Sequence, residues 1–219
     1  MVDFATLKTK LADHLGADLN RLSDSVRGDL INEAVRELCR GHDWLFNQVR
    51  GNITTVIGQQ GYTVADFSRP LQMWYPSTST PSQPVYIDQI SREEYVDRFP
   101  DATNSSNRGT PTHYTFFSAG SSVSLPILLG PAPDSVFTIS FDYLRLLPDL
   151  VNASDEHMMT VRAWEPVLYR ALVSATRYLM EDSRIPLFEE LAQKHERLVT
   201  IEQARSQTDG FRPISREPG

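Results

Sequence analysis

The sequence has little cysteine and no long apolar run. Cys39 is the single cysteine in 219 residues, which excludes an internal disulfide framework and is typical of a reducing compartment. No stretch approaches the roughly 20 apolar residues of a membrane-spanning helix. Asp3 interrupts the amino terminus where a signal peptide needs an apolar core. We therefore predict no membrane segment and no secretory leader.

Positive charge is also scarce. Lys and Arg number 21 against 28 Asp and Glu, which gives a formal net charge of -7. Proteins that hold nucleic acid through its phosphates gather Lys and Arg on one surface, so the composition argues against such a surface. An acidic wall facing DNA would instead let the DNA slide.

Recognisable catalytic and metal-binding motifs are missing. The five histidines are scattered, without the close His-His or Cys-His spacing of a metal site. Residues 155–157 (Asp-Glu-His) form the nearest cluster, and their position after Ser154 favours a helix start over a metal site. No nucleophile-elbow or cysteine-nucleophile signature is present. We predict no enzymatic activity, no metal and no cofactor.

The sequence does contain a β-rich middle. Between residues 108 and 150, apolar and polar residues alternate in three runs, which is typical of three consecutive antiparallel strands. Residues 118–121 and 130–134 supply the turns, because Gly and Pro favour turn conformations. The apolar row from Phe137 to Tyr143 is expected to be core.

More strands are predicted upstream. Residues 44–57 alternate as one long half-buried strand, residues 58–61 (Gly-Gln-Gln-Gly) form a turn, and Tyr62 begins the returning strand of a hairpin. A phosphate-binding loop is the weaker alternative, because neither Lys-Ser/Thr nor a helix follows these glycines. Further strands are expected at residues 71–75 and 85–90.

Both ends of the chain have the period of amphipathic helices. Helices are expected at residues 4–15 and 23–41, then as a short turn at 158–164, a main helix from Pro166 and a last helix from 185 to about 205. A capping box at residues 91–94 predicts another short helix. Cys39 lies on an apolar stripe, so we interpret it as a buried core residue rather than a reactive thiol.

These elements predict an α+β fold with one inserted domain. Residues 1–43 and 151–206 would form a helical bundle, residues 44–150 an inserted antiparallel β-sheet domain, and residues 207–219 an extended carboxy-terminal arm. The arm has too little apolar area to offset its ordering entropy alone.

Four aromatic residues stand near predicted element ends. Trp44 and Phe46 follow a helix end, so we interpret them as packing between helices and sheet. Trp74 and Tyr75 precede a polar loop, and the sequence leaves open whether they are core residues or partly exposed interface anchors.

Several short segments occur in an order that resembles a known family. They are LINEA at residues 30–34, GHDWLF at 41–46, GQQGY at 58–62, GTPTHY at 109–114, LGPAP at 129–133 with Tyr143 and Pro148, LYRAL at 168–172, Tyr178-Leu179, and RIP at 184–186. Across residues 26–205 this order resembles the head-to-tail connector, or adaptor, proteins of tailed bacteriophages, most of all those of podophage type.

The resemblance implies a structural protein of the virion neck, made in the host cytoplasm. Such proteins form a ring, usually a dodecamer, beneath the portal protein, extend the DNA channel and dock the tail nozzle or another neck protein. DNA would pass through the lumen without specific binding, and no membrane would be involved. Another neck protein, such as a stopper or terminator, is one alternative. A carbohydrate-binding or hydrolytic β module is another.

The resemblance also suggests which residues make contacts. The arm would bind the portal, because Phe211 and Ile214 can enter apolar pockets and its arginines can pair with acidic groups; a tail without a role is the alternative. The expected portal-binding residues are Arg205, Phe211, Arg212, Pro213, Ile214 and Arg216. The expected contacts with the tail or a neighbouring subunit are Trp74, Tyr75, Asn104, Asn107, Arg108, Gly120 and Gly130.

Overall fold

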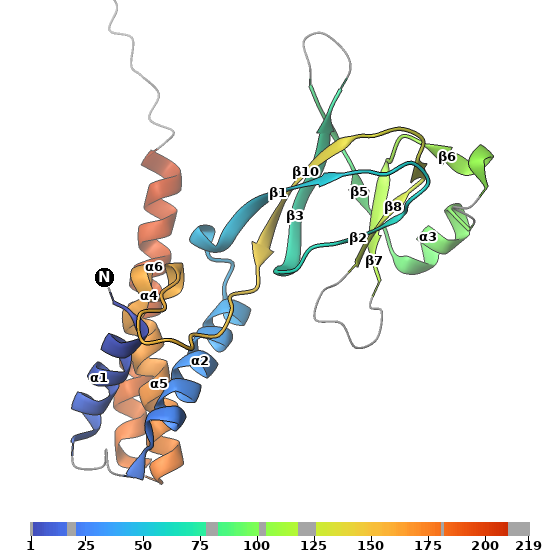
Figure 1. Cartoon of the computed structure of the whole chain (residues 1–219). Helices are drawn as coiled ribbons and strands as arrows, with labels where there is room; N and C mark the ends of the chain where they lie inside the picture. The colour runs from blue at the N-terminus through green and yellow to red at the C-terminus, as the bar shows by residue number, and fades with distance from the viewer. Residues whose placement is uncertain are drawn as a thin grey trace, which may run out of the picture. The chain divides into compact units, whose positions relative to one another are not determined.

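The chain forms two compact units that alternate along the sequence (Figure 1). The computed structural model describes residues 2–16, 21–77, 83–100, 104–117, 126–180 and 182–209. The helical unit consists of residues 1–47 and 147–219, and the β unit of residues 48–146. The predicted α+β fold class is confirmed. The predicted domain boundaries lie four residues from those between the units.

Capping side chains set the starts of the first helices. Asp3 accepts a hydrogen bond from the Thr6 amide at 2.8 Å, and Ser23 accepts one from the Val26 amide at 3.3 Å. These bonds satisfy amides that have no partner within their helix. The helical unit contains α1 (Phe4–Leu15), α2 (Asp24–Gly41), α4 (Met158–Arg162), α5 (Trp164–Leu179) and α6 (Ile185–Asp209), with short 3-10 turns at Leu45–Asn47 and Asp182–Arg184.

The carboxy-terminal helices follow the predicted divisions. Pro166 lies in the first turn of α5, where its missing amide hydrogen costs no helical bond. The short helix α4 is separate from α5, as expected. Helix α6 continues past the predicted end near Arg205 and reaches Asp209.

Helix α5 is the centre of the helical unit. It packs against α1, α2 and α6, and its buried apolar residues are Val167, Leu168, Ala171, Leu172, Val173, Ala175 and Leu179. They share one core with Leu7 and Leu11 of α1 and Ile31 of α2. Burying a leucine contributes roughly 1.5–3 kcal/mol to stability. Because leucines from both ends of the chain are buried in this core, its stability depends on both ends.

Cys39 lies at the edge of this core. Its side chain is half-buried rather than fully buried. Burial raises the pKa of the Cys39 thiol to about 11, so the thiolate, which is the nucleophilic form, is scarce at neutral pH.

Cys39 should therefore react slowly with alkylating reagents. At pH 8 we expect iodoacetamide to modify the folded chain about 100-fold more slowly than the urea-unfolded chain, because the thiolate fraction falls with the raised pKa. Mass spectrometry of timed samples measures both rates. Equal rates would show that the thiol is accessible and ordinary in the folded chain.

The β unit contains two main sheets (Figure 1). The first has the order β1 (Gln48–Thr54), β10 (Thr138–Arg145), β3 (Phe67–Pro76) and β4 (Pro84–Tyr86), with antiparallel neighbours. The second has the order β2 (Gly61–Thr63), β8 (Pro126–Gly130), β7 (His113–Phe116) and β5 (Asp88–Gln89), and its β5–β7 pair is parallel. A small parallel pair joins β6 (Arg108–Gly109) to β9 (Ala132–Pro133). Helix α3 spans Arg92–Arg98, and Ser91 caps it as predicted.

The predicted hairpin around residues 58–61 is wrong. Strand β1 pairs with β10, whereas β2 pairs with β8 of the other sheet. The intervening segment is closed by Tyr62, whose hydroxyl accepts a hydrogen bond from the Val56 amide at 2.9 Å and donates one to the Gln59 carbonyl at 3.0 Å. The side-chain bonds close the turn without requiring the two strands to pair.

The predicted run of three consecutive antiparallel strands is correct only for its first pair. Strands β7 and β8 pair as expected, but β10 lies in the first sheet between β1 and β3. The predicted single strand at 85–90 is also divided, because β4 and β5 belong to different sheets. Residues 118–125, with the predicted first turn and the start of the second strand, lie outside the described residues.

The two sheets share one apolar core. Ile139, Phe141 and Tyr143 of β10 are buried, which confirms most of the predicted row, while Phe137 is half-buried. They meet residues of the second sheet, including Tyr114, Ile127 and Leu129. The ring of Phe67 stacks on Tyr143 and Phe116, with centroids 5.5 and 5.1 Å apart, so aromatic rings connect the sheets.

Gly130 is closely covered by aromatic rings. A Cβ atom at this position would lie 2.4 Å from Phe99 and 2.9 Å from Tyr95. Tyr95 is held in place by its hydroxyl, which donates to the Leu129 carbonyl at 2.8 Å. Only glycine fits here without moving these rings.

Substituting Gly130→Ala should therefore destabilise the β unit. We expect a loss of about 1–3 kcal/mol in the free energy of unfolding, which is typical of overpacking, measured by urea denaturation followed by fluorescence. Gly61→Ala is the matched control, because its Cβ would meet Leu128 at an ordinary 3.5 Å. Equal losses in the two variants would contradict the packing explanation.

Candidate interaction surfaces

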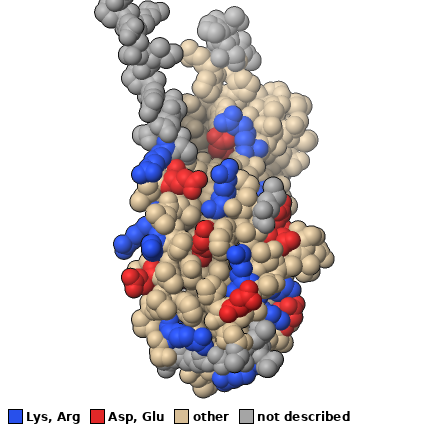
Figure 2. Space-filling view, turned by 90° about the vertical axis from the view of Figure 1, so that its left-hand side faces the viewer, with Lys and Arg blue, Asp and Glu red and all other residues tan. Residues whose placement is uncertain are grey.

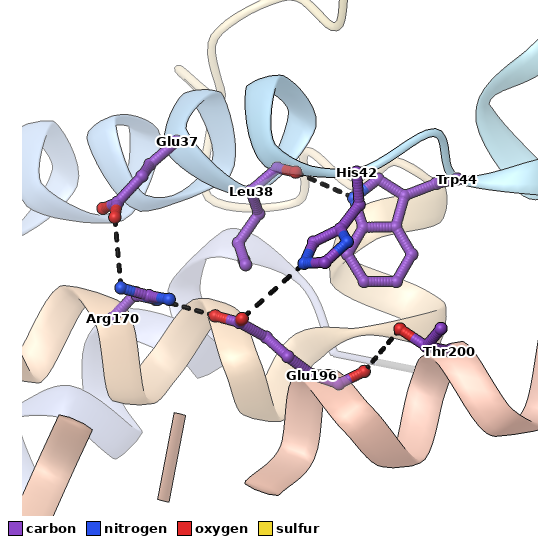
Figure 3. A network of polar contacts seen from close by, with 7 residues as sticks. All are labelled: Glu37, Leu38, His42, Trp44, Arg170, Glu196 and Thr200. Carbon is purple, nitrogen blue, oxygen red and sulfur yellow. Dashed lines mark hydrogen bonds and ion pairs between the residues drawn. The ribbon is translucent and has the colours of Figure 1, made fainter. Parts of the chain in front are cut away.

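A network of charged residues joins three helices of the helical unit (Figure 3). Arg170 of α5 donates from Nε to Glu196 Oε1 of α6 at 2.6 Å and from Nη1 to Glu37 Oε1 of α2 at 3.1 Å. The hydrogen bond from Arg170 to Glu196 raises the pKa of the Arg170 guanidinium. Glu196 is 8% exposed, so Arg170 neutralises a carboxylate that is almost removed from water.

Residues from the end of α2 complete this network. His42 Nε2 lies 3.7 Å from Glu196 Oε2, and the His42 ring lies beside that of Trp44 (Figure 3). Trp44 is buried in the helical core, and its indole donates to the Leu38 carbonyl at 2.9 Å. Phe46 is half-buried and stacks on Trp44. The structure thus places both aromatic residues in the helical unit.

A groove runs along α6 next to this core, and we call it the α4–α6 groove. Its deeper part encloses about 220 Å³ and is lined by Leu45, Phe46, Met158, Arg162, Val199, Glu202 and Gln203. A shallower part of about 400 Å³ shares Arg162, Val199 and Glu202 and continues to Trp164, Glu165 and Leu198. Most of the deep lining is apolar, so it can receive an apolar side chain.

The outer side of α6 carries three exposed apolar residues, with the exposed charged residues Glu190 and Lys194 between them. Leu187, Leu198 and Ile201 are 55%, 52% and 48% exposed, although the inward stripe of Phe188 and Val199 is buried. Helix α6 packs mainly on α5, which leaves this outer side uncovered within the described residues. In the face that Figure 2 shows, acidic and basic residues are interspersed rather than segregated.

Trp74 and Tyr75 are strand residues rather than loop residues. Both lie in β3 and are half-buried. The Arg50 guanidinium lies over the Trp74 ring, 4.8 Å from its centroid, and makes two hydrogen bonds to Asp142 at 2.8 and 3.1 Å. Tyr75 packs against Phe137 and the apolar core. Trp74 therefore belongs to a polar sheet surface, and Tyr75 to the opposite face of the same strand.

The remaining predicted contact residues have different environments. Asn104 and Asn107 are exposed, and the Asn104 side chain accepts a hydrogen bond from the Ser106 amide at 3.1 Å. Arg108 is half-buried in β6. Gly130 is buried beneath Phe99 and Tyr95, so the expectation that it lies in an exposed contact loop is wrong. Gly120 lies outside the described residues.

Of the predicted portal-binding residues, the structure describes only the first. Arg205 is an exposed residue of α6. Five of the predicted portal-binding residues lie outside the described part of the chain: Phe211, Arg212, Pro213, Ile214 and Arg216.

Sequence reasoning missed the Arg170 network and the α4–α6 groove. One signal was present, because Arg170 interrupts the mostly apolar run of residues 166–173 and Glu196 follows the inward stripe of α6. The pairing itself connects residues 26 positions apart, and the link to Glu37 spans 133. No local spacing rule predicts such contacts.

The described residues hold no group of three or more His, Cys, Asp or Glu side chains placed to bind a metal ion. Within the same part of the chain, none of the helices combines the length and apolarity that crossing a bilayer requires. The candidate sites are surfaces: a groove, a helix face and a sheet face.

Surfaces of these kinds are typical of proteins that work by contact with others. Comparison with protein families matches residues 2–216 to the SU10 adaptor protein. The chain belongs to the SU10 adaptor protein family, whose members are structural proteins of bacteriophages and not a class of enzymes. Comparison with curated proteins gives no match.

Arg170 should be important for the stability of the helical unit. Arg170→Met leaves Glu196 buried without its main partner, and breaking a buried ion pair costs about 3–5 kcal/mol. Because Arg170 is itself partly exposed, we expect roughly 2–4 kcal/mol, measured by urea denaturation. Adding Glu196→Met to the same chain should restore most of the loss.

Arg36→Ala provides the control for this prediction. Arg36 pairs with Asp149 on the surface, with 41% and 54% of the side chains exposed. Exposed pairs contribute about 0–1 kcal/mol. If Arg170→Met costs no more than Arg36→Ala, the network does not stabilise the helical unit.

Proposed function

We propose that this protein is a head-to-tail adaptor that forms a ring, a dodecamer, beneath the portal protein of a bacteriophage. The ring extends the DNA channel and docks the tail nozzle or another neck protein, so the protein is located in the virion neck. The observation that carries this proposal is the family match over residues 2–216, which includes both units and most of the arm.

The composition agrees with a channel that DNA crosses without being held. The net charge of -7 disfavours tight binding to phosphates. Neighbouring subunits of a ring repeat one heterologous contact until the rotation closes. The outer side of α6, where exposed apolar and charged residues alternate, and the sheet face around Trp74 are surfaces that such contacts, or contacts with the tail, can use.

The portal is the proposed partner of the arm. Residues 210–219 follow the end of α6 and contain Phe211 and Ile214 as apolar anchors, with Arg212 and Arg216 as cations. Arginine is among the residues that dominate binding energy, and aromatic residues such as Phe are enriched at interfaces. Because α6 ends at Asp209, a truncation after that residue leaves every described helix complete.

Deleting residues 210–219 should therefore abolish most binding to portal rings. We expect the affinity to fall at least about 30-fold, because losing one hot-spot residue costs about 2 kcal/mol or more. Surface plasmon resonance on immobilised portal rings measures this change. A shorter deletion of residues 217–219, which keeps the anchors, is the control and should bind nearly as the full chain does.

Undiminished binding by the longer deletion would contradict the role of the arm. Cryo-electron microscopy of the virion neck tests the position of the whole protein. Density for a ring directly beneath the portal supports an adaptor, whereas a ring further along the tail would identify a stopper or terminator.

A further inference from the structure

The α4–α6 groove is an apolar site without an occupant among the described residues. Its deep part is lined by Leu45, Phe46, Met158 and Val199, and the exposed Leu198 lies at its shallow end. Leaving such a surface in water is unfavourable, and concave apolar sites with a few polar groups are typical of binding sites. The residues that line the groove indicate what kind of segment can cover it.

The charges along the groove favour a basic occupant. Glu165 and Glu202 line it together with Arg162 and His195, so the two carboxylates outnumber the one permanent cation. An occupant that presents an apolar side chain between cations would match this pattern, since a charge-assisted pair is stronger than a neutral hydrogen bond.

We infer that the chain's own carboxy-terminal residues, 210–219, occupy the α4–α6 groove in the free protein, with Ile214 in its deep part. The segment has the required composition, because Ile214 stands between Arg212 and Arg216. Its arginines come close to Glu202, and Ile214 covers the apolar lining. The site and the segment belong to the same subunit.

The length of the segment fits the distance. Val199 precedes Asp209 by ten residues, which is about 15 Å along a helix. Ile214 follows Asp209 by five residues, which is about 16 Å of extended chain. Phe211 reaches only about 7 Å, so Ile214 rather than Phe211 is the side chain that can return to the groove. Gly210 is the next residue in the sequence after α6, and a residue without Cβ permits a chain reversal most easily.

The size of the site favours a tethered segment over a second copy of the chain. Stable association between separate proteins usually buries about 800 Å² and roughly 20–30 residues on each partner, whereas twelve residues line the two parts of the groove. A short tether holds its segment at millimolar effective concentration, so a small contact is enough.

This inference deepens the proposed function, because the same segment is the proposed portal anchor. A portal would have to compete with the α4–α6 groove for Ile214. The groove would therefore keep the arm covered until the arm binds a portal. Occupation of the groove does not itself require that the arm binds a portal, and the experiment below contains no portal.

Disulfide trapping tests the inference. In a Cys39→Ala chain, Leu198→Cys at the shallow end of the groove is combined with Ser215→Cys next to Ile214. The matched control combines Ser215→Cys with Thr200→Cys. Thr200 is exposed on the other side of α6, beside Gln193 and Arg197, and lies closer to the root of the segment, so random contact would favour the control. Circular dichroism checks that both chains fold.

We expect the disulfide from position 198 to form within single chains at least about tenfold faster than that from position 200, because docking raises the local concentration. Adding Ile214→Ser should remove this difference. Equal rates, a faster control, or cross-links formed only between chains would overturn the inference, the last of these indicating that a second copy fills the groove.

Discussion

The helical unit depends on a contact between residues 118 positions apart. The buried side chain of Asn32 in α2 donates to the Leu150 carbonyl at 3.0 Å and accepts from the Leu150 amide at 2.9 Å. Leu150 lies where the chain re-enters the helical unit after the β unit. A buried amide is stable only when its hydrogen bonds are satisfied. The two hydrogen bonds of Asn32 therefore fix the position of Leu150, where the chain returns from the β unit.

The first helix reinforces this closure. The amides of Phe4 and Ala5 donate to the carbonyls of Asp155 and Ala153, at 3.0 and 2.9 Å. Helix α1 thereby uses its otherwise unpaired first amides to hold the segment that leads into α4. Local caps form the helices, but these long-range bonds decide how the two ends of the chain meet.

Sequence patterns predicted the helices better than the strand partners. The caps at Ser23 and Ser91 and the position of Pro166 depend on neighbours within a few residues, so local chemistry was sufficient to place them. Alternation predicts which side of a strand is buried, but not which strand lies beside it. The side-chain bonds of Tyr62 replace a hairpin that the turn residues alone suggested.

The sequence predicts a candidate surface only where one short segment contains the residues that form it. The contact role of the arm stays a prediction, made from the family resemblance and from the apolar residues and arginines of one short segment, whereas the α4–α6 groove combines Phe46, Met158 and Val199 from three separate segments. At Gly130 the local sequence leads to the wrong prediction. Its sequence context indicates an exposed turn, but Tyr95 and Phe99 of a distant helix end cover it, and no neighbouring residue announces that contact.

Helix α6 joins the arm to the helical bundle. It is continuous from Ile185 to Asp209, and Arg170 holds its middle through Glu196. Helix α6 is therefore held to the bundle by a largely buried ion pair and by the buried Phe188 and Val199, rather than by exposed contacts alone. Breaking this attachment requires a buried charge to lose its partner, which is costly.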